Sequence, residues 1–169
     1  MNKRFLAVSV VLLAVGFCSG FVIGNRAHLP RNNAAFHDLR ISHIRDFPPL
    51  VDPRHKTIRA LASELKTPEA AYGFVRDRIR FAPASPDASA ASVLRNGEGS
   101  CLGKAALLCS LYRAMGLPPT AVRIITGTIA VSDYMTDHAW VDLEYGQACF
   151  QQDPSGMLGV FDFAQFPGM

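Results

Sequence analysis

Three residue types that together can carry out nucleophilic catalysis occur in the second half of the chain: Cys101, His138 and Asp153. A cysteine attacks as its thiolate, a histidine takes up the thiol proton and later returns it, and a carboxylate holds the imidazole in one tautomer and favours its protonated form. The three residues are 37 and 15 positions apart in this order. Only a fold that brings distant segments together could make one site of them.

Cys101 follows Ser100 at the predicted start of a helix. The unpaired backbone N–H groups and the dipole at a helix N-terminus favour an anion, so they lower the pKa of a thiol from about 8.5 toward neutrality. Lys104, one turn further on, is expected to add a positive charge on the same face. The alternative is that Cys101 is a small buried apolar residue, an interpretation that fits Cys109 and Cys149 well.

His138 begins a predicted strand, and Trp140 faces the same side of that strand. A histidine on a sheet that packs against the N-terminus of the cysteine helix could act as general base and acid. Trp140 is then a candidate substrate-binding residue. A structural histidine with satisfied hydrogen bonds is the alternative interpretation of His138.

Asp153 ends the next predicted strand, where it could lie beside His138. The alternative is a turn aspartate, because Asp-Pro often initiates turns. Asp137 and Asp142 are competing candidates for the carboxylate, and Asp142 lies on the His138 face but further along the strand.

Apolar periodicity predicts the helices that would position these residues. One helix is expected over residues 55–66. A second begins with Thr67 as N-cap and Pro68 at the first helical position, and ends by Pro83. A third, over residues 101–115, is apolar around most of its circumference and is therefore expected to be central and buried.

After residue 120 the apolar period changes to two, which predicts strands over residues 121–131, 138–145 and 148–152, with a turn at Gly146-Gln147. The order is helices first and antiparallel strands second. The sequence therefore predicts an α+β domain in which the cysteine helix packs on an antiparallel sheet.

The N-terminus has a different character. Lys3 and Arg4 precede a run of 20 uncharged residues over 5–24, which is long enough for a helix to cross a bilayer. We expect residues 1–24 to be a membrane anchor or a signal sequence, residues 25–54 a Pro- and Asn-containing spacer, and residues 55–169 the folded domain, held outside the cytoplasm. If the segment is cleaved, the protein is secreted.

Composition narrows the function classes. Hydrophobic residues make up 49% and charged residues 18% of the 169 residues, which excludes a disordered chain and a multidomain enzyme. No basic cluster with interleaved aromatics is present, so no nucleic-acid partner is expected. The histidines and cysteines show no zinc-type spacing, so neither a metal nor a cofactor is expected. The oligomeric state stays open.

Several short blocks resemble the core of the transglutaminase-like superfamily, in the form of its small bacterial members: 74–77, 92–94, 99–105, 113–118, 137–141 and 153–154. The resemblance implies a papain-like cysteine fold in which Cys101 is the nucleophile, His138 the general base and acid, and Asp153 the orienting carboxylate. It implies acyl transfer: hydrolysis of a peptide or other amide bond, or transfer of a glutamine acyl group to an amine. The chain shows no calcium-loop pattern, which favours hydrolysis over crosslinking.

Two functional hypotheses follow. The first is a membrane-anchored thiol enzyme that acts on a protein or peptide substrate, with the backbone N–H of Cys101 as one oxyanion donor and the second donor unassigned. The second is a non-catalytic anchored domain of the same fold that binds a partner protein. A pairing of Cys109 with Cys149 outside the cytoplasm is a further expectation.

Overall fold

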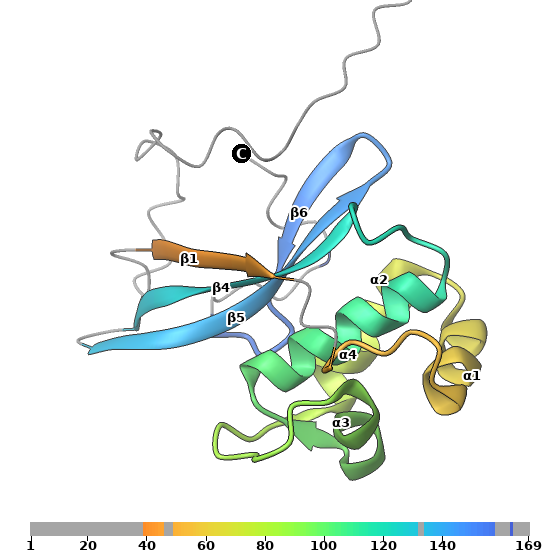
Figure 1. Cartoon of the computed structure of the whole chain (residues 1–169), viewed down its shortest axis with the longest axis horizontal. Coiled ribbons are helices and arrows are strands. Elements are labelled where there is room, and N and C mark those ends of the chain that lie inside the picture. The colour runs from red at the N-terminus through yellow and green to blue at the C-terminus, as the bar shows by residue number, and fades with distance from the viewer. Residues whose placement is uncertain (1–38, 46–48, 132–133, 158–162, 164–169) are drawn as a thin grey trace, which may run out of the picture.

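The computed structural model describes residues 39–45, 49–131, 134–157 and 163. Within these residues the chain forms four helices and six strands, a mixed α+β arrangement (Figure 1). In chain order they are β1 (Leu39–Arg45), α1 (Lys56–Leu65), α2 (Pro68–Arg78), β2 (Arg80–Phe81), α3 (Ala90–Asn96), β3 (Glu98–Gly99), α4 (Cys101–Ala114), β4 (Val122–Val131), β5 (Tyr134–Tyr145) and β6 (Ala148–Gln152).

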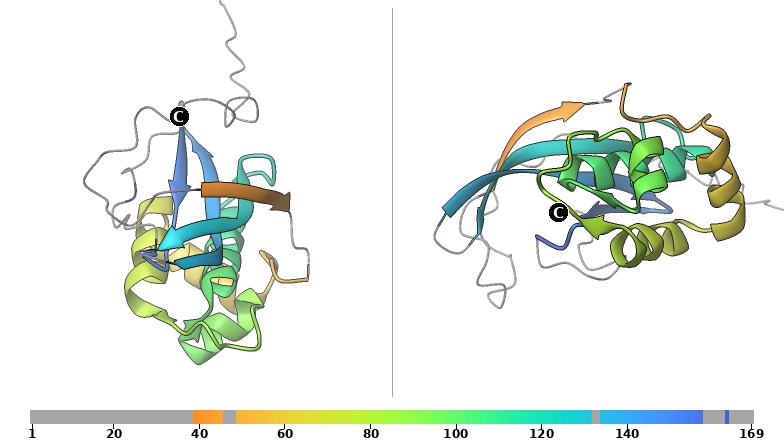
Figure 2. Two further views of the ribbon diagram at one scale, coloured as in Figure 1. Left: turned by 90° about the vertical axis from the view of Figure 1, so that its left-hand side faces the viewer. Right: turned by 90° about the horizontal axis from the view of Figure 1, so that it is seen from below.

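The main sheet has the strand order β1-β4-β5-β6 and is antiparallel throughout. β4 and β5 form a long hairpin, from Val131 opposite Tyr134 to Val122 opposite Leu143. β6 pairs only with the Val141–Tyr145 part of β5. The half of β5 that contains His138 therefore continues past the end of β6. The helices gather on one side of the molecule, and the outer part of β1, β4 and β5 extends away from them (Figures 1 and 2).

The N-terminal part of the sheet corrects one expectation. β1 pairs with β4 although it lies within residues 25–54, the range expected to be a spacer. Val51 is buried in the core, and the Leu50 carbonyl accepts a hydrogen bond from the Ala90 N–H at 2.9 Å. The folded unit thus begins before residue 55. The expected anchor over residues 1–24 lies outside the described residues, and the part of the chain that is described contains no helix long and apolar enough to cross a bilayer.

Helix α4 is the centre of the domain, as its composition predicts. Ten consecutive residues, from Gly103 to Tyr112, are buried, and the helix packs against α1, α2, α3, β4 and β5. The Ser100 hydroxyl caps its first turn by accepting a hydrogen bond from the Gly103 N–H at 3.3 Å. At the other end, the Tyr112 hydroxyl donates to the Gln152 amide oxygen at 2.6 Å and ties the helix to the last residue of β6.

Helices α1 and α2 also follow their sequence signals. The Thr67 side chain caps α2 by accepting from the Ala70 N–H, with Pro68 at the first position. The helix ends at Arg78 rather than at Pro83, because the chain turns into the short strand β2, which pairs in parallel with β3. Neither this strand pair nor α3 was expected, since each is too short to show a period.

Close packing of α3 on α4 depends on Gly103. A Cβ built at Gly103 would lie 2.9 Å from Val93 Cγ2 and 3.4 Å from the Ala88 Cα. We expect Gly103→Ala to lower the unfolding free energy by about 1–3 kcal/mol because the two helices must move apart. Adding Val93→Ala to this variant should restore part of the lost unfolding free energy. Gly73, in α2, has open space around its Cβ position. Gly73→Ala is therefore the matched control, and should stabilise the helix by about 0.5–1 kcal/mol. Urea unfolding curves measure both, and equal effects would contradict the packing argument.

Candidate active site

Cys101 is the first residue of α4 and is half-buried. Burial acts to raise the pKa of its thiol. The hydrogen bond to His138, the charge of His138 and the backbone N–H groups of Ala139 and Leu102 outweigh burial and hold the thiol pKa below its ordinary value. Cys101 therefore lies where β5 continues past the end of β6, beside the backbone of Ala139. The free-thiol state and the helix N-terminal position agree with what the sequence predicts.

His138 contacts both other members of the predicted set. Its Nε2 lies 3.0 Å from Asp153 Oδ2, and both side chains are completely buried. When the imidazole is protonated, this contact joins opposite charges in a buried ion pair. Burial acts to lower the pKa of His138, but the contacts with Asp153 and Cys101 raise it to about 9. At neutral pH this arrangement favours an imidazolium beside the Asp153 carboxylate.

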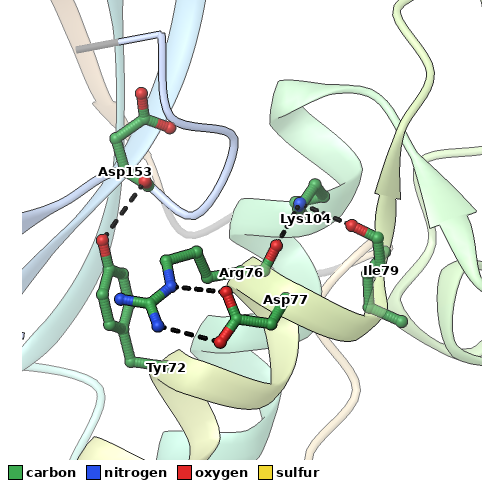
Figure 3. A network of polar contacts seen from close by, with 6 residues as sticks. All are labelled: Tyr72, Arg76, Asp77, Ile79, Lys104 and Asp153. Carbon is green, nitrogen blue, oxygen red and sulfur yellow. Dashed lines mark hydrogen bonds and ion pairs between the residues drawn. The ribbon is translucent and has the colours of Figure 1, made fainter. Parts of the chain in front are cut away.

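Asp153 is held from several sides. Its Oδ1 accepts from the Ser155 N–H at 2.9 Å and from the Ser155 hydroxyl at 2.5 Å, while Oδ2 faces His138. Its backbone carbonyl accepts from the Tyr72 hydroxyl at 3.4 Å and from the Gly156 N–H at 3.3 Å (Figure 3). One carboxylate oxygen of Asp153 thus builds the turn, and the other lies beside His138, where it is expected from the sequence.

The two competing aspartates are engaged elsewhere. Asp142 forms a 2.6 Å ion pair with Arg123 on β4. Asp137 is exposed and accepts a hydrogen bond from the Thr128 hydroxyl at 3.2 Å. Asp153 is thus the carboxylate in contact with His138 among the described residues.

Trp140 supports the imidazole. The two rings are stacked, with centroids 5.9 Å apart and planes inclined by 19°, which confirms that Trp140 and His138 share a side. Trp140 is completely buried, and its indole N–H has no hydrogen-bond partner. Its contact with His138 limits rotation of the imidazole. A direct contact with substrate stays a prediction.

Two other expectations need correction. Lys104 directs its amine to the end of α2, where it donates to the Ile79 carbonyl at 2.6 Å and the Arg76 carbonyl at 3.4 Å (Figure 3). Cys109 carries a buried thiol whose Sγ donates to the Val122 carbonyl at 3.8 Å, so it does not form a disulfide with Cys149. In both cases the side chain donates to a backbone carbonyl that is distant in sequence, so the sequence alone does not predict the contact.

Sequence reasoning missed the residues that hold Asp153. Tyr72 fits the apolar stripe of α2, so the sequence gives no sign of its hydroxyl contact. Ser155 lies in the turn after β6. No group of residues able to hold a metal ion occurs among the described residues. A shallow cavity of about 320 Å³ lies along the start of α1 and includes none of the site residues.

The family model for the transglutaminase-like superfamily matches residues 54–153, a range that includes Cys101, His138 and Asp153. No curated protein and no solved structure matches the chain.

Proposed function

Because the chain belongs to the transglutaminase-like superfamily, we propose that it is a thiol-dependent acyl-transfer enzyme in which Cys101, His138 and Asp153 form a catalytic triad. The proposed reaction is hydrolysis of an amide or peptide bond in a protein or peptide. The proposed location is outside the cytoplasm, with the N-terminal segment as membrane anchor. The observation that carries the catalytic proposal is the contact of one buried histidine with both the Asp153 carboxylate and the Cys101 thiol.

The geometry supports a two-step mechanism. The Cys101 thiolate attacks the carbonyl carbon, a C–S bond forms, and the carbonyl electron pair moves to the oxygen, where the backbone N–H of Cys101 is a proposed donor. The His138 imidazolium gives its proton to the leaving nitrogen as the C–N bond breaks, which leaves a thioester.

Water then completes the proposed cycle. His138 takes a proton from the water molecule, the hydroxide attacks the thioester, and the C–S bond breaks to restore the thiolate. Asp153 stabilises the imidazolium that is present before each proton donation. An amine in place of water would give transfer rather than hydrolysis.

Acylation by a chromogenic ester tests this proposal. With p-nitrophenyl acetate we expect a rapid release of about one equivalent of nitrophenol and an acetyl group on Cys101, detected by peptide mass. Cys101→Ala should abolish the burst. Cys109→Ala, which changes a buried thiol, is the matched control and should retain it. A burst that survives Cys101→Ala, or an unreactive Cys101 in the unchanged protein, would favour the non-catalytic binding domain instead.

A further inference from the structure

Lys104 is a buried cation that the mechanism above does not use. Its side chain is only 2% exposed, and no carboxylate within the described residues lies close enough to form an ion pair with it. Its amine lies at the C-terminal end of α2, where it donates to the Arg76 and Ile79 carbonyls (Figure 3). A cation is favourable at a helix C-terminus. A buried charge is nevertheless costly unless other charges compensate it.

The compensating charges belong to the candidate active site. Among the described residues, Lys104, His138 and Asp153 are the buried side chains that can carry charge. With His138 protonated, these three sum to one positive charge. Ionisation of the half-buried Cys101 thiol brings the sum to zero. The reactive form of the site contains the thiolate, the imidazolium and the carboxylate. Without Lys104 these three groups would carry one net negative charge in a region of low dielectric constant.

Helix α2 fixes the separation of Lys104 from Asp153. Tyr72 and Arg76 are four residues apart on this helix and therefore lie on one face. The Tyr72 hydroxyl donates to the Asp153 backbone carbonyl, and the Arg76 backbone carbonyl accepts from the Lys104 amine (Figure 3). The same helix thus contacts the residue beside His138 and the lysine one turn after Cys101.

We propose that Lys104 is a positioning residue whose ammonium group balances the buried charge of the triad and so favours the thiolate of Cys101. This inference rests on the proposed function. The pKa of Lys104 is lowered by burial and raised in turn by the charges of Asp153 and Asp77. Asp77 is half-exposed and paired with Arg76, so Asp153 is the buried one of these two anions.

The other groups around Lys104 leave this balance unchanged. Tyr72 on α2 is titratable but neutral near pH 7. The Arg76 guanidinium is paired with Asp77, since its Nε donates to Asp77 Oδ1 at 2.6 Å. From β5, His138 is the titratable group that contacts Cys101 and Asp153.

Substitution of Lys104 separates its charge from its hydrogen bonds. The readout is the rate at which iodoacetamide modifies Cys101 in the full chain as a function of pH, assigned by peptide mass. Lys104→Met should raise the apparent thiol pKa by about half a unit or more. Lys104→Gln keeps an N–H donor without the charge and should raise it similarly, while Lys104→Arg should keep it low. A residue that only caps α2 would change the melting temperature and leave the thiol pKa unchanged, which would overturn the proposal.

A second measurement needs no substitution of Lys104. The side-chain pKa of ¹⁵N-labelled Lys104 is followed by NMR in the full chain, before and after Cys101 is blocked with neutral iodoacetamide. Coupling between two sites is reciprocal, so loss of the thiolate charge should lower the Lys104 pKa. An unchanged value would refute the charge balance. A thiol of ordinary pKa that does not respond to His138→Ala would instead refute the proposed function, so the two failures are distinguishable.

Discussion

Replacing His138 with alanine should slow the cleavage of an amide substrate by about 10²–10⁴-fold, the usual contribution of a positioned general acid and base. The variant loses two effects at once. The Cys101 thiol loses the hydrogen bond and charge that lower its pKa. The leaving nitrogen loses its proton donor, without which an amide C–N bond breaks slowly.

A matched pair of substrates separates these two effects. A p-nitrophenyl ester has a leaving group that needs no proton, so its acylation rate reports only the thiolate. The corresponding p-nitroanilide also needs the general acid, so its rate should fall further in His138→Ala. His55→Ala, which removes an imidazole that contacts Thr57, is the control and should change neither rate. Equal losses for ester and anilide would contradict the role of His138 as proton donor.

Replacing Asp153 with asparagine should remove a pH-dependent part of the folding stability. The pKa of His138 in the folded protein, about 9, lies above its ordinary value of 6.5. The ion pair therefore stabilises the fold fully below pH 6.5, and this stabilisation is lost as the pH rises toward 9. Removing one partner of a buried ion pair is also costly at low pH, typically by about 3–5 kcal/mol.

The measurement needs Cys101→Ala as background, because the lowered thiol pKa of Cys101 acts in the opposite direction over the same pH range. In this background we expect the urea-derived unfolding free energy to fall by about 1–3 kcal/mol between about pH 6 and pH 9. The fall should disappear when Asp153→Asn is added and persist when the exposed Asp137 is changed to asparagine. A fall that persists without Asp153 would show that another group carries it.

The parts of this domain that sequence alone predicts are those with local signals. The cap at Ser100, the apolar surface of α4 and the alternation along β5 each depend on residues close in sequence. They place Cys101 at a helix start and His138 on a strand. The packing of α4 against β5 then brings the two together.

The parts that sequence does not predict depend on distant partners. β1 forms because it pairs with the edge of β4, which lies more than 70 residues later in the chain. Lys104 is correctly placed on α4, but its long side chain reaches the carbonyl groups at the end of α2 rather than Cys101. Tyr72 contacts Asp153 across 81 positions of sequence. Periodicity carries no information about such contacts.

The ionisation of Cys101 is the most direct test of the triad. The rate at which iodoacetamide modifies Cys101 is measured from about pH 4 to pH 10 in the full chain and in His138→Ala. Peptide mass separates Cys101 from the completely buried Cys109, which should stay unmodified. We predict a thiol pKa well below the ordinary value of about 8.5 that rises when His138 is removed. An ordinary thiol pKa that stays the same in His138→Ala would contradict the proposed triad.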